Sequence, residues 1–265
     1  MTRRRGRILP AALATVGILA LGLLVLLPLA ALVVRAPWGS AGALLDTREV
    51  RDALGLSLIV SLWSLVLVIT FGFPIAWVLA RGTFPGRSLL RALVLLPMVV
   101  PPVIGGVALL VAFGRRGLVG QHLDEWFDIR LAYTRAAAVL AATFVSMPFF
   151  VVTVEAALRG VDRRLEDAAR TLGGSPTFVL WHITLPSIRG ALGAGAALSW
   201  ARALGEFGAT ITFAGSFAGQ TQTMPLAIYD LLDRDVHAAI LVSLVLLAVS
   251  VAVLAGLRDR WLGAP

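Results

Sequence analysis

Two oppositely charged residues lie inside an otherwise apolar stretch of this sequence. Arg202 and Glu206 are four residues apart within residues 190–213, which contain no other charge. A charge in the middle of a lipid bilayer is costly unless it is paired or reaches water, and this spacing lets the two side chains meet on one face of a helix. They form either a structural ion pair or part of a pathway or gate for a charged solute, to which Thr210 and Thr212 could donate hydrogen bonds.

The other reactive side chains indicate neither catalysis nor a cofactor. His122, His182 and His237 are scattered along the chain, which does not support a metal site. Serine, aspartate and glutamate residues show no spacing suited to nucleophilic or paired-carboxylate catalysis. All 23 basic residues are arginine and there is no cysteine, which excludes a Walker A phosphate loop with its lysine and thiolate metal sites. The chain is therefore not expected to be an enzyme or to hold a cofactor of its own.

The composition predicts a membrane protein. Hydrophobic residues make up 58% of the 265 residues and charged residues 14%, whereas a soluble domain has about 45–50% and about 25%. So much apolar surface cannot be hidden in one soluble core, and part of it must face lipid. The net charge of +8 is explained by the arginines that membrane proteins concentrate in cytoplasmic loops. We therefore expect the lipid bilayer, and not nucleic acid, as a partner.

Long charge-free segments predict where the chain crosses the membrane. A helix needs about 20 apolar residues to span a bilayer. We expect six spans in a single all-α domain over residues 1–265, with the charged segment 190–213 counted as one of them. The spans are about 8–34, 53–80, 92–114, 136–154, 190–213 and 238–257, and the longest inner loop is about 155–189.

The distribution of arginine predicts the orientation. With the N-terminus inside, the inner segments hold 14 arginines in 61 residues and the outer segments hold 8 in 63. Arginine is enriched on the cytoplasmic side, so both termini are expected in the cytoplasm. The basic start of the chain resembles a signal peptide, but its apolar segment is far longer than the about 7–15 residues of a cleaved signal. We interpret it as a retained first helix.

Prolines interrupt the third and fourth spans. Pro97, Pro101 and Pro102 precede the glycines at 105–106, and Pro148 lies in the fourth span. Proline removes a helix donor and clashes with the preceding turn. Within a membrane such breaks persist where other protein or a cavity satisfies the freed groups. Ordinary kinking is one interpretation, but three prolines in six residues favour a helix that lines or gates a pathway, with Pro101 and Pro102 as candidate residues.

The inner loop predicts two short helices that project from the membrane. Residues 162–172 are expected to form the first helix, with Asp162 as its cap and with an apolar stripe along one face. The stripe consists of Val161, Leu165, Ala168 and Leu172. Gly173-Gly174 ends this helix, and Ser175-Pro176 begins the second. Two small helices joined by glycines are typical of a docking element for another protein; a helix that lies on the lipid surface is the alternative.

The spacing of residues in this loop resembles that of ABC importer permeases. In that family an acidic residue and two alanines are followed after three residues by glycine, after nine more by isoleucine, and after one more by leucine and proline. The matching residues are Asp167, Ala168, Ala169, Gly173, Ile183, Leu185 and Pro186. Asp167 replaces the usual glutamate and keeps its charge, whereas the earlier Glu155-Ala156-Ala157 lacks the rest of the pattern. The resemblance implies a coupling helix seated in a groove of a cytoplasmic ATPase.

Further residues are similar to molybdate and tungstate permeases in particular. They lie at 200–210, 214–216 and 221–229 and in the proline-rich third span. The sulfate and thiosulfate permeases share the core around Arg202 and Glu206 but differ more in residues 221–229. A sulfate or thiosulfate importer permease is therefore the alternative.

The resemblance implies a permease of the type I, MetI-like importer fold in the cytoplasmic (inner) membrane of a bacterium. It also implies a homodimer around a central pathway, two copies of a separate ATPase that hold ATP and Mg²⁺, and an extracytoplasmic molybdate-binding protein. Transport would follow an alternating-access mechanism. An ion-coupled secondary transporter is a further alternative, but it predicts inverted repeats that the sequence does not clearly show.

Overall fold

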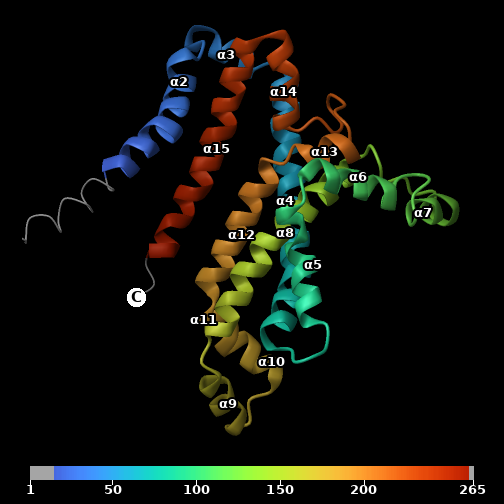
Figure 1. Ribbon diagram of the computed structural model, residues 1–265, viewed down its shortest axis with the longest axis vertical. Coiled ribbons are helices and arrows are strands. Elements are labelled where there is room, and N and C mark those ends of the chain that lie inside the picture. Colours follow the sequence, from blue (N-terminus) through green and yellow to red (C-terminus); the bar gives the residue numbers. More distant parts are fainter. Residues whose placement is uncertain (1–14, 263–265) are drawn as a thin grey trace, which may run out of the picture.

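The computed structural model describes residues 15–262, and for residues 253–262 only the helical backbone. The described part of the chain is helical and contains no strand, which confirms the expected all-α fold. The longest helices run roughly along one axis (Figure 1). One end of the molecule carries α9 (Arg163–Thr171), and the other carries α3 (Ala41–Leu45) and α14 (Met224–Arg234).

Long apolar helices alternate with short connecting elements. The first helix covers Thr15–Arg35 and includes the π-helical turn η1 (Gly22–Leu26) and α2 (Leu27–Arg35). The other longer helices are α4 (Arg48–Arg81), α5 (Arg87–Val99), α6 (Pro102–Phe113), α8 (Arg135–Gly160), α12 (Arg189–Leu204) and α15 (Val236–Leu262). The remaining short elements are η2 (Trp38–Ser40), α7 (Gly120–Phe127), α10 (Pro176–Val179), η3 (Leu180–Thr184), α11 (Leu185–Ser187) and α13 (Gly208–Phe213).

Three helices, α4, α8 and α12, form the centre of the fold. They approach closely because small residues face a large one: Phe150 of α8 is buried between Gly72 of α4 and Gly195 of α12. A Cβ atom would come within 2.9 Å of the Phe150 ring at Gly72 and within 3.2 Å at Gly195. Small residues let membrane helices pack at short distance, so glycine at these two positions sets the spacing of the three helices.

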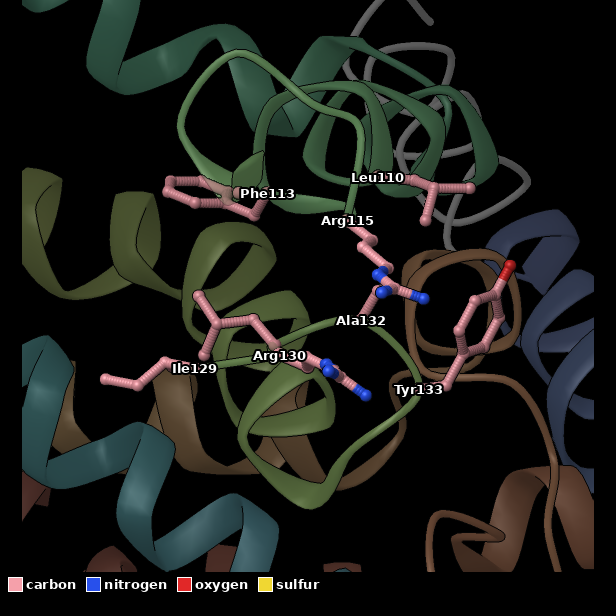
Figure 2. A pocket seen from close by; sticks show the side chains of 9 residues that line it. Leu110, Phe113, Arg115, Ile129, Arg130, Ala132 and Tyr133 are labelled. Atoms are coloured by element: carbon pink, nitrogen blue, oxygen red, sulfur yellow. The ribbon is translucent and has the colours of Figure 1, made fainter. Parts of the chain in front are cut away.

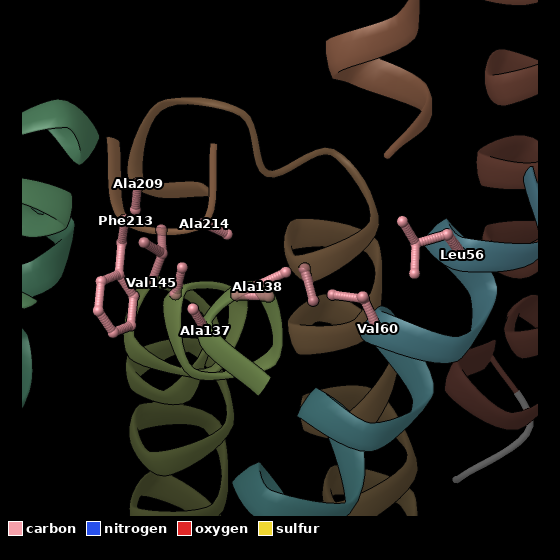
Figure 3. Packing of buried hydrophobic residues seen from close by; sticks show 11 residues of the cluster. Leu56, Val60, Ala137, Ala138, Val145, Ala209, Phe213 and Ala214 are labelled. Atoms are coloured by element: carbon pink, nitrogen blue, oxygen red, sulfur yellow. The ribbon is translucent and has the colours of Figure 1, made fainter. Parts of the chain in front are cut away.

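The same helices hold α13 in place. Figure 3 shows Ala137 and Ala138 of α8 lying between Val60 of α4 and Phe213 of α13. All four side chains are buried. α13 is therefore fixed against α8 and cannot shift without disturbing this part of the core.

Serines on one face of α4 add hydrogen bonds between the central helices. Ser57 accepts the backbone N–H of Met224 at 2.7 Å, and Ser61 accepts the Nε1–H of Trp200 at 2.8 Å. Further along α4, the Oγ atom of Ser64 lies 3.3 Å from that of Ser146 on α8. Buried polar groups need such partners, and these contacts tie α4 to α8, α12 and the start of α14.

The structure contains several helices suited to crossing a membrane, and the number of six spans remains a prediction. Among the described residues, Thr15–Arg35, α4 and α8 are long and apolar enough to cross a bilayer by length and composition. α5 and α6 make a fourth span if they are taken together. The apolar part of α15 whose side chains are described, Val236–Ala252, is shorter.

Two predicted spans are not continuous helices. Residues 92–114 form α5 and α6, which are bent by 117°. The predicted interruption by proline is therefore present, but it is a sharp turn and not a kink, since the residue before a proline is pushed out of the helical conformation. Residues 190–213 form α12 and α13, with a break that begins at Gly205. Glycine is a poor helix former, and a charged side chain stabilises the break, as described below.

The ends of the other predicted segments shift by a few residues. The predicted spans 53–80 and 136–154 lie inside α4 and α8, and α8 continues to Gly160. Residues 155–160 of the inner loop predicted at 155–189 are therefore helical. Residues 8–14 of the span 8–34 lie outside the described residues, as do the side chains of 253–257 in the span 238–257.

Candidate functional site

The predicted charged pair bridges the break between α12 and α13. Nη2 of Arg202 lies 2.7 Å from Oε2 of Glu206, so the expected contact is present. The two residues were expected on one face of a continuous helix. This expectation is wrong, because α12 ends at Leu204, before Glu206. The other carboxylate oxygen of Glu206 accepts the backbone N–H of Ala209 at 2.7 Å. Glu206 therefore caps the first turn of α13 and pairs with Arg202 at the same time.

The two halves of this pair are unequally enclosed. The Glu206 side chain is 2% exposed and that of Arg202 is 27% exposed. Within the described part of the chain, Oε2 of Glu206 has no aligned hydrogen-bond donor, so its contact with Arg202 is electrostatic. A buried carboxylate depends on its counter-ion, whereas the guanidinium also reaches the surface. Arg202 is thus the half of the pair that can meet another charged group.

The start of α6 packs so closely on α13 that both helices need glycine there. A Cβ atom at Gly106 would lie 2.7 Å from the backbone oxygen of Ala209 and 1.7 Å from Oγ1 of Thr212. A Cβ atom at Gly208 would lie 3.0 Å from Cβ of Pro102. The proline bend and the Arg202–Glu206 pair are therefore neighbours in space, although a hundred residues of sequence separate them.

The two threonines predicted as donors are not free hydroxyls in this conformation. Thr212 donates to backbone oxygens of its own helix, at 3.0 Å to Gly208 and 3.2 Å to Ala209. Thr210 is 1% exposed. Pro101, by contrast, is exposed at the bend. Of the residues predicted for a pathway, Pro101 is exposed, Pro102, Arg202 and Thr212 are half-buried, and Glu206 and Thr210 are buried.

The predicted pair of short helices is present between α8 and α12. Asp162 accepts the backbone N–H of Arg164 at 2.9 Å, and Ser175 accepts that of Phe178 at 3.2 Å, so both predicted caps are confirmed. Gly173 has a φ of +88°, a conformation that favours glycine, and it follows the end of α9. Of the other residues in the predicted pattern, Asp167, Ala168 and Pro186 are exposed, and Ala169, Ile183 and Leu185 are half-buried.

α9 exposes leucine and buries a charge. Leu165 is 55% exposed and Leu172, next to its end, is 90% exposed. Glu166 is the one buried residue among the nine that form this helix, all of which the structure describes. Leu165 and Leu172 of the predicted stripe therefore face away from the rest of the chain, whereas Val161, its first residue, packs against the core. Exposed apolar surface of this kind marks a site of interaction.

Two buried glutamates at this end of the molecule were not predicted as site residues from the sequence. Oε1 of Glu166 lies 2.8 Å from Nη2 of Arg81, at the end of α4. Glu155 of α8 contacts Arg91 of α5 and lies 2.7 Å from Arg159. Arg81 and Glu166 are 85 residues apart, so no periodic pattern connects them. The one available signal was the cluster of arginines at the predicted inner ends of the spans.

A cavity of about 240 Å³ lies between α6, the start of α7 and residues 129–133, which precede α8 (Figure 2). Its apolar wall includes Leu110 and Phe113 of α6. Arg115 and Arg130 also line it, but each donates to Asp124 at 2.8 Å, and Arg130 further donates to Asp128 at 3.2 Å. Two arginines thus face two aspartates, and this balanced cluster leaves no spare positive charge for an anion.

The cluster predicts an acid-sensitive connection between α6 and α8. Hydrogen bonds from Arg130 and then Arg115 hold the pKa of Asp124 below its ordinary value. A lowered pKa in the folded state stabilises the fold above the unfolded-state pKa, and this contribution is lost as the pH falls through the folded-state value. Hydrogen exchange in residues 115–130, corrected for intrinsic rates, should be constant near neutral pH and accelerate only in acid. Asp124→Asn should remove this acid-dependent step; a step of equal size in that variant would contradict the assignment.

Comparison with known proteins agrees with these features. Residues 69–263 match the family described as "Binding-protein-dependent transport system inner membrane component". The molybdenum transport system permease protein ModB of Mycobacterium tuberculosis is 45% identical over 236 residues, 89% of each chain. The sulfate transport system permease protein CysW of Synechococcus elongatus is 38% identical over 222 residues, 83% of this chain and 77% of that one.

A solved structure has the same fold. It is a bacterial alginate ABC transporter in complex with an alginate pentasaccharide-bound periplasmic protein. One of its chains aligns with a TM-score of 0.73 at 17% identity, covering 95% of this chain and 92% of that chain. This likeness confirms the ABC importer permease fold, and the family match identifies a membrane transport subunit and not an enzyme. The chain belongs to the family of binding-protein-dependent transport system inner membrane components.

Proposed function

We propose that this chain is the membrane-spanning subunit of an ATP-driven importer that carries molybdate, or the related tungstate, into the cytoplasm. The class of transporter is supported above all by the family match over residues 69–263. It is further supported by Leu165 on α9 and Leu172 just after it, which are exposed at one end of the molecule. The cargo is supported by the relative named for molybdenum transport, which is 45% identical, against 38% for the relative named for sulfate transport. Sulfate or thiosulfate is the second candidate, and the same experiment separates the two.

In the proposed arrangement, residues 1–265 form one domain with six spans and both termini in the cytoplasm. α12, α13 and α15 would supply the two spans beyond the four that length and composition support. The excess of arginine on the proposed inner side supports this orientation. α9 then lies on the cytoplasmic side and α3 and α14 lie on the outer side, at opposite ends of the long axis (Figure 1).

The proposed assembly contains two copies of this chain, cytoplasmic ATPase subunits and an extracytoplasmic molybdate-binding protein. The family description itself supports a binding protein as partner. ATP and Mg²⁺ would bind the ATPase, because a chain without lysine has no Walker A lysine. Tetrahedral dianions of similar shape are hard to distinguish with few fixed donors, so the binding protein would supply most of the selectivity.

The proposed coupling surface is formed by α9 and the segment that follows it. Asp167, Ala168 and Ala169 lie on α9, and Gly173 provides the turn behind them. Ile183 lies in η3, and Leu185 and Pro186 lie in α11, which leads back to α12. ATP-driven closure of the ATPase pair would move this segment, and the helices would reopen outward in the alternating-access cycle.

The proposed pathway or gate comprises the α5–α6 bend and the α12–α13 break. Pro101 and Pro102 shape the bend, and the Arg202–Glu206 pair shapes the break. Arg202 would offer one partly exposed positive charge to a passing dianion. Thr210 and Thr212 would contribute to this pathway only if the helices rearranged, because here one is buried and the other is bonded within α13. A pathway must also release its cargo, and a single cation suits weak, transient contact.

The function is tested by uptake into cells that lack this chain. Molybdate, tungstate and sulfate uptake are measured in parallel, and then again after the gene is restored. We expect loss of molybdate and tungstate uptake with sulfate uptake intact; loss of sulfate uptake alone would move the cargo to the second candidate. In liposomes, uptake should require the ATPase and ATP. Uptake driven by a proton or sodium gradient without ATP would refute the importer class.

Ala169→Arg is expected to separate the chain from its ATPase. Ala169 is half-buried beside the exposed stripe of α9, so arginine there places a large charge in the proposed docking surface. The variant should reach the membrane in normal amounts but should fail to retain the ATPase during co-purification. Ala156→Arg, at an exposed position of α8, is the matched control and should retain it. Wild-type uptake by the Ala169→Arg variant would remove α9 from the mechanism.

A further inference from the structure

The coupling segment is attached to the helix bundle by a charged residue outside the seven-residue pattern. Glu166 is 6% exposed, while the other eight residues of α9 are exposed or half-buried. A helix on the surface of a protein normally buries apolar side chains on its inner face. α9 instead turns Leu165 outward, and its one buried side chain is a carboxylate, so a charged contact contributes to its attachment to the bundle.

One carboxylate oxygen joins three segments of the chain. Oε1 of Glu166 accepts a hydrogen bond from Nη2 of Arg81 at 2.8 Å and another from the hydroxyl of Thr184 at 2.9 Å. Arg81 is the last residue of α4, and Thr184 ends η3, where it is fully buried. Charge-assisted hydrogen bonds of this kind are short and strong. The contact therefore fixes α9 against both α4 and the segment that returns to α12.

Arg81 also depends on this contact, because Glu166 compensates its charge. The Arg81 side chain is 13% exposed, and its Nε has no hydrogen-bond partner among the described residues. Removing one member of a buried ion pair leaves the other charge uncompensated, whereas removing both leaves no stranded charge. Neutralising Arg81 and Glu166 together therefore separates the effect of the pair on folding from its effect on coupling.

The backbone connects α9 to α8 and to α10, but not directly to α4. Two residues, Val161 and Asp162, join it to α8, and the turn with Gly173 and Gly174 joins it to α10. α4, by contrast, is a helix of 34 residues that packs along α8 and α12. A sideways tie from α9 to the end of α4 would pass a displacement of α9 directly to the longest helix among the described residues.

We propose that Glu166, through Arg81, is the positioning residue that transmits movement of α9 to α4. This role rests on the proposed function, in which an ATPase moves α9. The contact is a direct charged link between α9 and the end of α4. Its loss is expected to lower the amount of substrate transported for each ATP hydrolysed, and to leave ATPase binding unchanged, because the docking face of α9 is the opposite one.

The experiment measures transport per ATP in liposomes that contain the complete transporter with its ATPase and binding protein. The test variant is the double change Arg81→Met with Glu166→Gln, which removes both charges and keeps an acceptor for Thr184. We expect normal yield and ATPase retention, with transport per ATP lowered roughly two- to thirtyfold, the range seen for changes along coupling networks. Glu166→Gln alone should also lower the yield, because it strands Arg81.

Glu155→Gln is the matched control. Glu155 is a second buried glutamate at the same end, 7% exposed and paired with Arg91 and Arg159, but it lies on α8 and not on α9. Neutralising Glu155 should lower the yield of folded protein but should not lower transport per ATP. Wild-type transport per ATP in the double variant would overturn the proposal, as would an equal loss in Glu155→Gln. If the wild-type complex shows no ATP-driven uptake at all, the proposed function fails instead.

Discussion

Gly106→Leu is expected to abolish transport and to lower the amount of folded protein in the membrane. Even a Cβ atom at this position would lie 2.7 Å from the backbone oxygen of Ala209, and 1.7 Å from Oγ1 of Thr212. Backbone cannot yield as a side chain can, so α6 must move away from α13. Overpacking of a close contact typically costs about 1–3 kcal/mol or more. Membrane yield, thermal stability in detergent and substrate uptake measure the effect.

Two other glycines provide controls for this prediction. At the neighbouring Gly105, a Cβ atom would meet the ring of Phe144 at 2.7 Å, and a ring at the edge of the core can rotate aside. Gly55 of α4 has nothing within 4 Å of a Cβ atom. The loss of stability should therefore decrease in the order Gly106→Ala, Gly105→Ala, Gly55→Ala, with the last change neutral or slightly stabilising. Equal tolerance of alanine at Gly106 and Gly55 would contradict the tight α6–α13 contact.

The helices of this chain could be predicted from the sequence because the membrane imposes a strong pattern on it. A run of about 20 apolar residues without charge is unmistakable, and α4 and α8 contain the segments expected on this basis. The proline cluster likewise predicts an interruption of the third span. The angle of 117° between α5 and α6 could not be predicted, because it depends on how α6 packs on α13 and α8. Contacts between segments so far apart in the chain produce no periodic pattern in the sequence.

The candidate site was predictable to the extent that its residues are neighbours in sequence. The Arg202–Glu206 contact follows from a spacing of four residues, and the α9 stripe follows from its helical period. A continuous helix through Glu206 was wrong, because Gly205 ends α12 and Glu206 uses its carboxylate to begin α13. The Arg81–Glu166 contact could not be predicted, since either residue viewed alone is an ordinary charge in an inner loop.

Arg202→Ala is expected to be more damaging to stability than the double change Arg202→Ala with Glu206→Gln. The single change leaves the Glu206 carboxylate, 2% exposed, without its counter-ion, and breaking a buried pair in this way costs about 3–5 kcal/mol. Glutamine in the double variant carries no charge and can still accept the N–H of Ala209, so the cap of α13 survives. Thermal unfolding in detergent should therefore show recovery in the double variant.

Uptake by the same variants separates the two interpretations of the pair. If Arg202 serves only to neutralise Glu206, transport should recover together with stability. We expect stability to recover while uptake stays low, because the partly exposed guanidinium is the one charge of the pair that can meet a passing dianion. Full recovery of both would assign the pair a structural role alone. Additive effects of the two single changes, within about 0.3–0.5 kcal/mol, would contradict the pairing itself, since contacting residues are expected to show a coupling energy above that range.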